Sequence, residues 1–224
     1  MKPFFVLMIL ILANNYSVLG QDSLGIKEVV YKSAYPEGVY FTKDDFIKKT
    51  PSQVQIVPKS IIGFKKKVLV ENVHNCFFYN VSSDKKITKA FAVSYKGDLY
   101  FQINAILKNR HKDDDSQTNS FPHSFVRVIM GGDNFLYTEA DLANSWAKAA
   151  AYGGVGGGVG AVLANSFIYG KGVVWDFNNS EFNIFRNCKD FNEFIRDRYE
   201  IGIQDCKKSQ PDALKIREII EKIK

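Results

Sequence analysis

A histidine and a cysteine lie two residues apart in His74-Asn75-Cys76, a spacing that suits nucleophilic chemistry. On a β-strand, residues two apart project from the same face, so the imidazole and the thiol would be neighbours. A catalytic thiolate also needs a base within hydrogen-bonding distance and a site for an oxyanion. Because Phe77 and Phe78 follow Cys76, we predict a buried core there, where a free cysteine is commonly inert. An enzyme with a site near His74 and Cys76 is kept as an alternative.

Two further histidines, His111 and His123, lie in or near a polar tract at residues 108–120 that contains three consecutive aspartates, 113–115. These aspartates lack the alternate spacing and the glycine of a calcium-binding loop. We expect a solvated turn in a mobile loop between strands, and no metal site. The sequence also lacks Gly-x-Ser-x-Gly, His-Glu-x-x-His and Cys-x-x-Cys, so no cofactor is predicted.

The most unusual segment is residues 149–170, which carries no charge and contains seven glycines and five alanines. As a helix it would span about 33 Å, enough to cross a bilayer. A spacing of four residues places small side chains in rows, which let a second helix backbone approach closely. The predicted close-packing or oligomer face comprises Gly153, Gly157 and Ala161 in one row and Gly156, Gly160 and Ala164 in another.

Three interpretations of this segment compete. Seven glycines disfavour an isolated helix by roughly 6 kcal/mol, so the helix needs a close-packed neighbour or a membrane. We favour a glycine-rich helix packed tightly against the sheet, because the flanking strands are expected to belong to the same domain. The second interpretation is membrane insertion or self-association through a glycine zipper. The third is a phosphate-binding loop, which we reject because residues 156–161 fit only a loose dinucleotide pattern and follow an alanine-rich stretch instead of a strand.

The chain contains three cysteines, so it forms at most one intramolecular disulfide. Cys188 and Cys206 are the pair closest in sequence, and a bond between them would tie two C-terminal helices together. We predict the disulfide Cys188–Cys206, which leaves Cys76 either buried or in an intermolecular bond.

Residues 1–20 are typical of a secretory signal peptide. A positive charge precedes an apolar run at residues 4–13, and a polar stretch then leads to the small residue Gly20. The run is shorter than the roughly 20 residues of a membrane span. We expect cleavage after Gly20, a linker at 21–34 and a single domain at 35–224.

The hydrophobic periodicity of this domain predicts an α+β fold. Thr42 is a good N-cap for a short helix, with Asp45 three residues later. From residue 53 to about residue 139 the apolar positions alternate, which indicates an antiparallel β meander, as a small curved sheet or a barrel.

The remainder of the domain is predicted to combine helices with one hairpin. Residues 138–148 resemble the start of the glycine- and alanine-rich helix, and residues 172–185 form a hairpin. Two helices follow at the C-terminus. The last of them is expected to begin at Ser209, with Pro211 in its first turn.

The segment from Gly38 to Phe46, followed by Pro51-Ser52, resembles the start of a family of uncharacterised exported proteins from Gram-negative bacteria. The later order of the glycine- and alanine-rich tract and the strand at residues 173–177 is also similar to the layout of that family. The resemblance implies export to the periplasm or outer envelope, or secretion. It implies no catalytic residues, since the family has no assigned activity.

The net charge of +6, from 30 basic and 24 acidic side chains, is spread along the chain, and nucleic-acid binding requires clustered cations. We therefore predict no nucleic-acid partner. The favoured interpretation is a non-enzymatic exported protein of the cell envelope that acts through binding or assembly. The alternatives are the enzyme described above and a membrane-associated oligomer that self-associates through residues 149–170.

Overall fold

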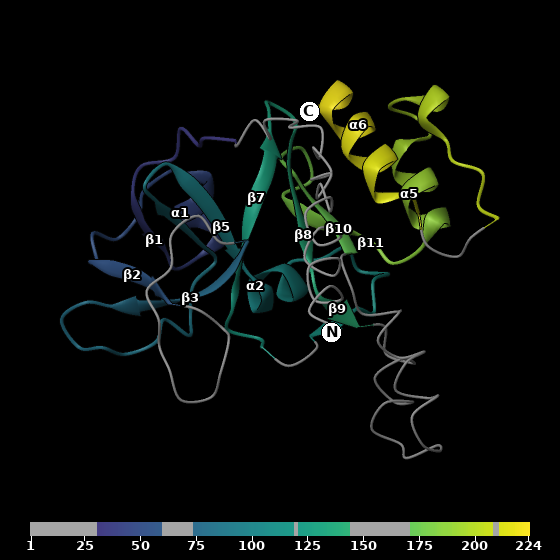
Figure 1. The fold of residues 1–224 in the computed structure, drawn as a ribbon. Coiled ribbons are helices and arrows are strands. Elements are labelled where there is room, and N and C mark those ends of the chain that lie inside the picture. The colour runs from purple at the N-terminus through teal and green to yellow at the C-terminus, as the bar shows by residue number, and fades with distance from the viewer. Residues whose placement is uncertain (1–30, 60–73, 119–120, 144–170, 208–210) are drawn as a thin grey trace, which may run out of the picture.

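The computed structural model describes residues 31–59, 74–118, 121–143, 171–207 and 211–224 (Figure 1). The predicted signal peptide, most of the predicted linker and the predicted helix at 149–170 lie outside the described residues. Among the residues that are described, no helix is long and apolar enough to span a membrane.

In the part of the chain that the structure describes, nine antiparallel strands form one curved sheet, which confirms the α+β class. The described sheet is open, with β1 and β11 at the ends of its main path. Of the two predicted alternatives, the curved sheet is therefore confirmed and the closed barrel is not. The strands are β1 (Gly38–Tyr40), β2 (Ile56–Lys59), β3 (Asn75–Asn80), β4 (Ala92–Tyr95), β5 (Asp98–Gln102), β7 (Phe125–Gly131), β8 (Phe135–Ala140), β10 (Lys171–Asp176) and β11 (Glu181–Phe185). A separate pair joins β6 (Gln117–Thr118) to β9 (Leu142–Ala143).

The order of strands along the main path, β1-β4-β5-β7-β8-β10-β11, is mostly that of a meander. It departs from a meander where β1 pairs with β4, and where β3 pairs with β7 as well as with β2. The hairpin of β10 and β11 is confirmed, with Trp175 opposite Phe182.

The helices within the described residues are α1 (Lys43–Ile47), α2 (Ile103–Lys108), α5 (Cys188–Ile195) and α6 (Ala213–Ile223), with a 3-10 turn at Glu200–Gly202. Figure 1 shows α5 and α6 together beside the β10–β11 end of the sheet, while α1 lies near β1. Helix α1 has the predicted cap: Thr42 Oγ1 accepts from the Asp45 N–H at 3.0 Å, and Asp45 Oδ2 accepts from the Thr42 N–H at 2.9 Å.

Three local predictions are wrong. Residues 138–140 end β8 and residues 142–143 form β9, where a helix was predicted, because Thr138 lies opposite both Val128 and Val173 and sheet pairing overrides local propensity. Helix α2, which buries Ile106, begins directly where β5 ends and was not predicted. The last helix is capped by Asp212, whose carboxylate accepts from two backbone N–H groups of its first turn.

The end of the predicted linker belongs to the folded domain. Tyr31 packs against the main core, and the Ser33 N–H donates to the Gly97 carbonyl at 2.8 Å. Lys32 Nζ lies 2.8 Å from Asp98 Oδ1.

The strand β10 is buried on both faces, because successive side chains of a strand point to opposite sides. Trp175 lies in an aromatic core with Phe46, Phe91 and Phe182. Val174, on the other face, lies in a second core with residues of α5 and α6. The sheet therefore separates an aromatic core from the layer of C-terminal helices.

Candidate functional site

The pair His74 and Cys76 does not form a nucleophile with its base in the described structure. Cys76 is fully buried in a cluster that includes Tyr100 and Phe125, and this burial raises the pKa of its thiol to about 12. The His74 Nε2 atom lies 3.0 Å from the backbone carbonyl oxygen of Glu139, on strand β8. The thiol is therefore protonated at neutral pH, and the imidazole is held by a different strand.

The aspartate run at 113–115 differs from its prediction as a solvated turn. Asp113 and Asp115 are exposed, but Asp114 is 9% exposed. The Asp114 carboxylate accepts from the Ser116 N–H at 2.8 Å and lies 3.4 Å from a nitrogen of both Arg110 and Arg186. The prediction fails because two arginines compensate the buried charge: Arg110, four residues earlier in sequence, and Arg186, which is distant in sequence.

Arg186 is the centre of this ion-pair network. It directly follows strand β11. Its Nε lies 2.8 Å from Asp190 Oδ2 in the first turn of α5, and another of its nitrogens lies 2.9 Å from Asp115 Oδ1. The hydrogen bond to Asp190 raises the pKa of Arg186, whereas burial raises the pKa of Asp114 despite its two arginines. The network ties the loop after α2 to the C-terminal helical layer.

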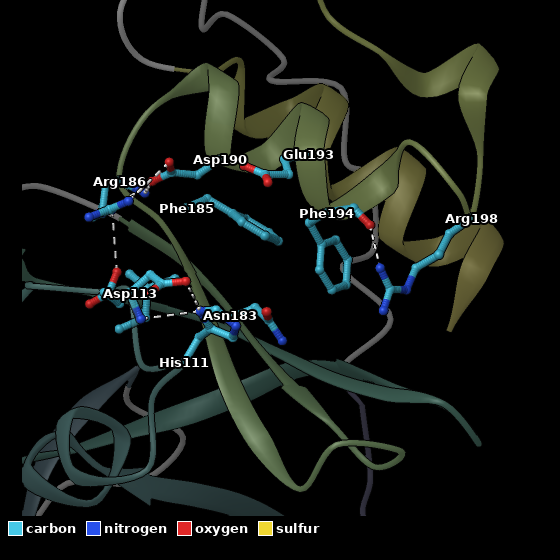
Figure 2. A pocket seen from close by; sticks show the side chains of 11 residues that line it. His111, Asp113, Asn183, Phe185, Arg186, Asp190, Glu193, Phe194 and Arg198 are labelled. Carbon is cyan, nitrogen blue, oxygen red and sulfur yellow. Dashed lines mark hydrogen bonds and ion pairs between the residues drawn. The ribbon is translucent and has the colours of Figure 1, made fainter.

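A cleft of about 220 Å³ opens beside this network, between the loop, β11 and α5 (Figure 2). Its floor and walls combine apolar rings with charged groups of both signs. At one end Arg198 donates to the Phe194 carbonyl at 2.6 Å and lies 3.2 Å from the fully buried Asp176. The lining residues are His111, Asp113, Asp114, Asn183, Ile184, Phe185, Arg186, Asp190, Glu193, Phe194 and Arg198.

Most charged groups of this cleft are partners of one another. The His111 Nδ1 lies 3.7 Å from Asp113 Oδ2, and no group of three or more His, Cys, Asp or Glu able to hold a metal ion occurs among the described residues. Sequence reasoning missed Arg186 and Asp190. The sequence feature that could have indicated this ion pair is the spacing of four residues between Arg186 and Asp190, on either side of the N-cap Asn187.

Removal of the Arg186 charge should destabilise the protein. Breaking a fully buried ion pair costs roughly 3–5 kcal/mol, and because the Arg186 side chain keeps 27% exposure we expect Arg186→Met to cost about 2 kcal/mol. Urea unfolding would measure the loss. Lys207→Met is the matched control, since its exposed pair with Asp205 should contribute nothing measurable.

The cost of Arg186→Met should depend on pH in a defined direction. Without Arg186, the pKa of Asp114 rises further above its ordinary value. When the pKa of a carboxyl is higher in the folded than in the unfolded state, the ionised group destabilises the fold, and this effect is full at pH values above the pKa of the folded state. At pH values below the pKa of the unfolded state the group is protonated in both states, and the destabilisation disappears. The deficit should therefore shrink as the pH falls through the carboxylate range, and Asp114→Asn should partly restore stability at neutral pH. A deficit independent of pH and of Asp114 would contradict this account.

A disulfide joins Cys188 and Cys206, the pair predicted from the sequence. Cys188 is the first residue of α5, and Cys206 lies beyond the 3-10 turn. Asn192 reinforces the connection, because its side chain accepts from the Gln204 N–H at 2.9 Å and donates to the Gln204 carbonyl at 2.8 Å. The bond closes the segment that follows α5 back onto that helix.

A second, larger cleft of about 630 Å³ lies between α1, the segment before β4, and α2. It is lined by three lysines, a histidine, polar uncharged side chains and two aromatic rings. The lining residues are Phe41, Thr42, Lys43, Thr88, Lys89, Ala90, Phe91, Gln102, Asn104, Ala105, Lys108, Asn109 and His123.

The comparisons with known proteins add no relative. No protein-family model matches the chain, and no curated protein or solved structure matches it. The resemblance to exported Gram-negative proteins stays a prediction, as do the small-residue rows at 149–170, which lie outside the described residues.

Proposed function

We propose that this protein is exported to the cell envelope and acts there by non-covalent binding or assembly. The observation that carries export is the disulfide Cys188–Cys206, because such bonds persist in oxidising compartments outside the cytosol. It agrees with the signal peptide expected at residues 1–20. The resemblance to exported Gram-negative proteins supports the same compartment.

A binding role is supported by the relation between the clefts and the reactive groups. Cys76, whose burial raises the pKa of its thiol, lines neither of the two clefts described above. In the smaller cleft, the charges of Arg186 and Asp190 are committed to each other. The clefts thus offer shape, charge and hydrogen bonds, which are the requirements of recognition.

Fractionation of cells that produce the full chain tests this proposal against membrane insertion through residues 149–170. A protein that binds at or within the envelope should leave the membrane fraction in an alkaline carbonate wash. Retention in the pellet, alongside a resident integral membrane protein, would overturn the proposal in favour of the membrane-associated oligomer. Recovery in the cytosolic fraction would overturn export.

A further inference from the structure

We propose that the larger cleft, between α1 and α2, binds a small anionic ligand that carries hydroxyl groups, of the class of phosphorylated sugars. This inference rests on the proposed binding function and names the ligand chemistry. Its volume of about 630 Å³ suits a small molecule. Four features of the lining support the assignment: its charge, its buried polar atoms, its aromatic ring and its uncharged polar side chains.

The charge of this cleft is of one sign. Lys43, Lys89 and Lys108 line it, and no acidic side chain is among the lining residues that the structure describes. None of the three forms an ion pair with another described residue; Lys43 Nζ reaches only the Ser180 carbonyl, at 3.4 Å. The carboxylate of Asp45, on the same helix as Lys43, is engaged by the Thr42 N–H. Three like charges around one cleft repel one another, and an anion removes that repulsion.

One buried polar atom of the lining has no partner among the described residues, and a second makes only a long hydrogen bond. His123 Nδ1 is buried and has no hydrogen-bond partner in the described part of the chain. Gln102 is only 2% exposed, and its Nε2 lies 3.5 Å from the Ile87 carbonyl, at the limit of a hydrogen bond. Buried polar atoms are nearly always paired in proteins, so the unpaired Nδ1 of His123 indicates a further partner such as a ligand oxygen.

The remaining lining side chains suit a sugar better than a bare anion. Phe41 lines this cleft and is 44% exposed, and a ring of this kind packs against the C–H face of a sugar. Thr42, Thr88 and Asn104 offer hydroxyl and amide groups for hydrogen bonds to hydroxyls. Inorganic phosphate uses only the cationic part of such a site.

Calorimetric titration of the full processed protein tests the assignment with three probes: glucose 6-phosphate, inorganic phosphate and glucose. We expect glucose 6-phosphate to bind most tightly, phosphate more weakly, and glucose without measurable heat. The double variant Lys89→Gln/Lys108→Gln should weaken binding of glucose 6-phosphate about tenfold or more. The exposed control Lys207→Gln should bind as the unmodified protein does.

A second variant separates sugar from phosphate recognition. Phe41→Ala should weaken binding of glucose 6-phosphate while leaving the affinity for phosphate unchanged. Equal affinities for phosphate and glucose 6-phosphate in the unmodified protein would overturn the sugar assignment. Unchanged binding in the double lysine variant, or no binding of any probe, would overturn the site.

The same samples separate this inference from the proposed function. Phosphorus NMR of the titrated solution should show glucose 6-phosphate intact. Release of inorganic phosphate would overturn the non-enzymatic role while the cleft assignment stands. If no probe binds but carbonate still releases the protein from the envelope, the assignment of phosphorylated sugars is overturned. The proposed location in the envelope is then unaffected.

Discussion

Trp175→Ala should lower the free energy of unfolding by about 4 kcal/mol, the largest loss we expect from a single substitution. Trp175 is fully buried in β10, and its ring centroid lies 4.8 Å from that of Phe182, 5.3 Å from Phe91 and 5.8 Å from Phe46. Alanine would remove most of the side chain and leave a cavity among rings that cannot all move to fill it. Urea unfolding should show a lower midpoint with an unchanged slope.

A second substitution at this position makes the test specific for packing. Trp175 Nε1 is buried and has no hydrogen-bond partner among the described residues. Trp175→Phe therefore loses volume but no hydrogen bond, and should cost about 1–2 kcal/mol. Ile201→Ala is the surface control and should leave stability unchanged, because Ile201 is 89% exposed. Equal losses for the alanine and phenylalanine variants would contradict a packing origin.

Removal of the disulfide Cys188–Cys206 should cost about 3 kcal/mol, the second-largest expected loss. The bond closes a loop between residues 18 apart, and an open loop would gain conformational entropy in the unfolded chain. Double substitution to alanine should lower the thermal midpoint, and dithiothreitol should lower that of the unmodified protein to a similar value.

The double variant is also the control for the reductant. Its remaining cysteine, Cys76, is a buried free thiol, so dithiothreitol should not change its thermal midpoint. A shift of the double variant in dithiothreitol would show that another bond is being reduced. An unmodified protein that is insensitive to the reductant would contradict the stabilising role.

Local signals were sufficient for several elements of this fold. The capping box of Thr42 and Asp45 and the hairpin of β10 and β11 depend on residues close together in sequence. The disulfide was predictable because Cys188 and Cys206 are close in sequence and lie in a chain expected to be exported. Alternating apolar residues indicated the antiparallel sheet.

The rest depended on contacts between distant residues. Asp114 resembled a solvated residue because its compensation comes from Arg186, 72 positions later. Thr138 has a partner strand on each side, which local propensity does not reveal. The lysine-lined cleft joins residues spread from Phe41 to His123, so no local motif revealed its positive charge or the unpaired nitrogen of His123.

Intact mass measurement of the native protein, isolated from the envelope and alkylated without reduction, tests the central claim of export most directly. We predict a chain that begins at Gln21, lacks the two hydrogens of the Cys188 and Cys206 thiols, and takes up one alkyl group at Cys76 only after denaturation. A chain that still begins at Met1 and carries three alkylated thiols would contradict export and the binding role proposed for the envelope.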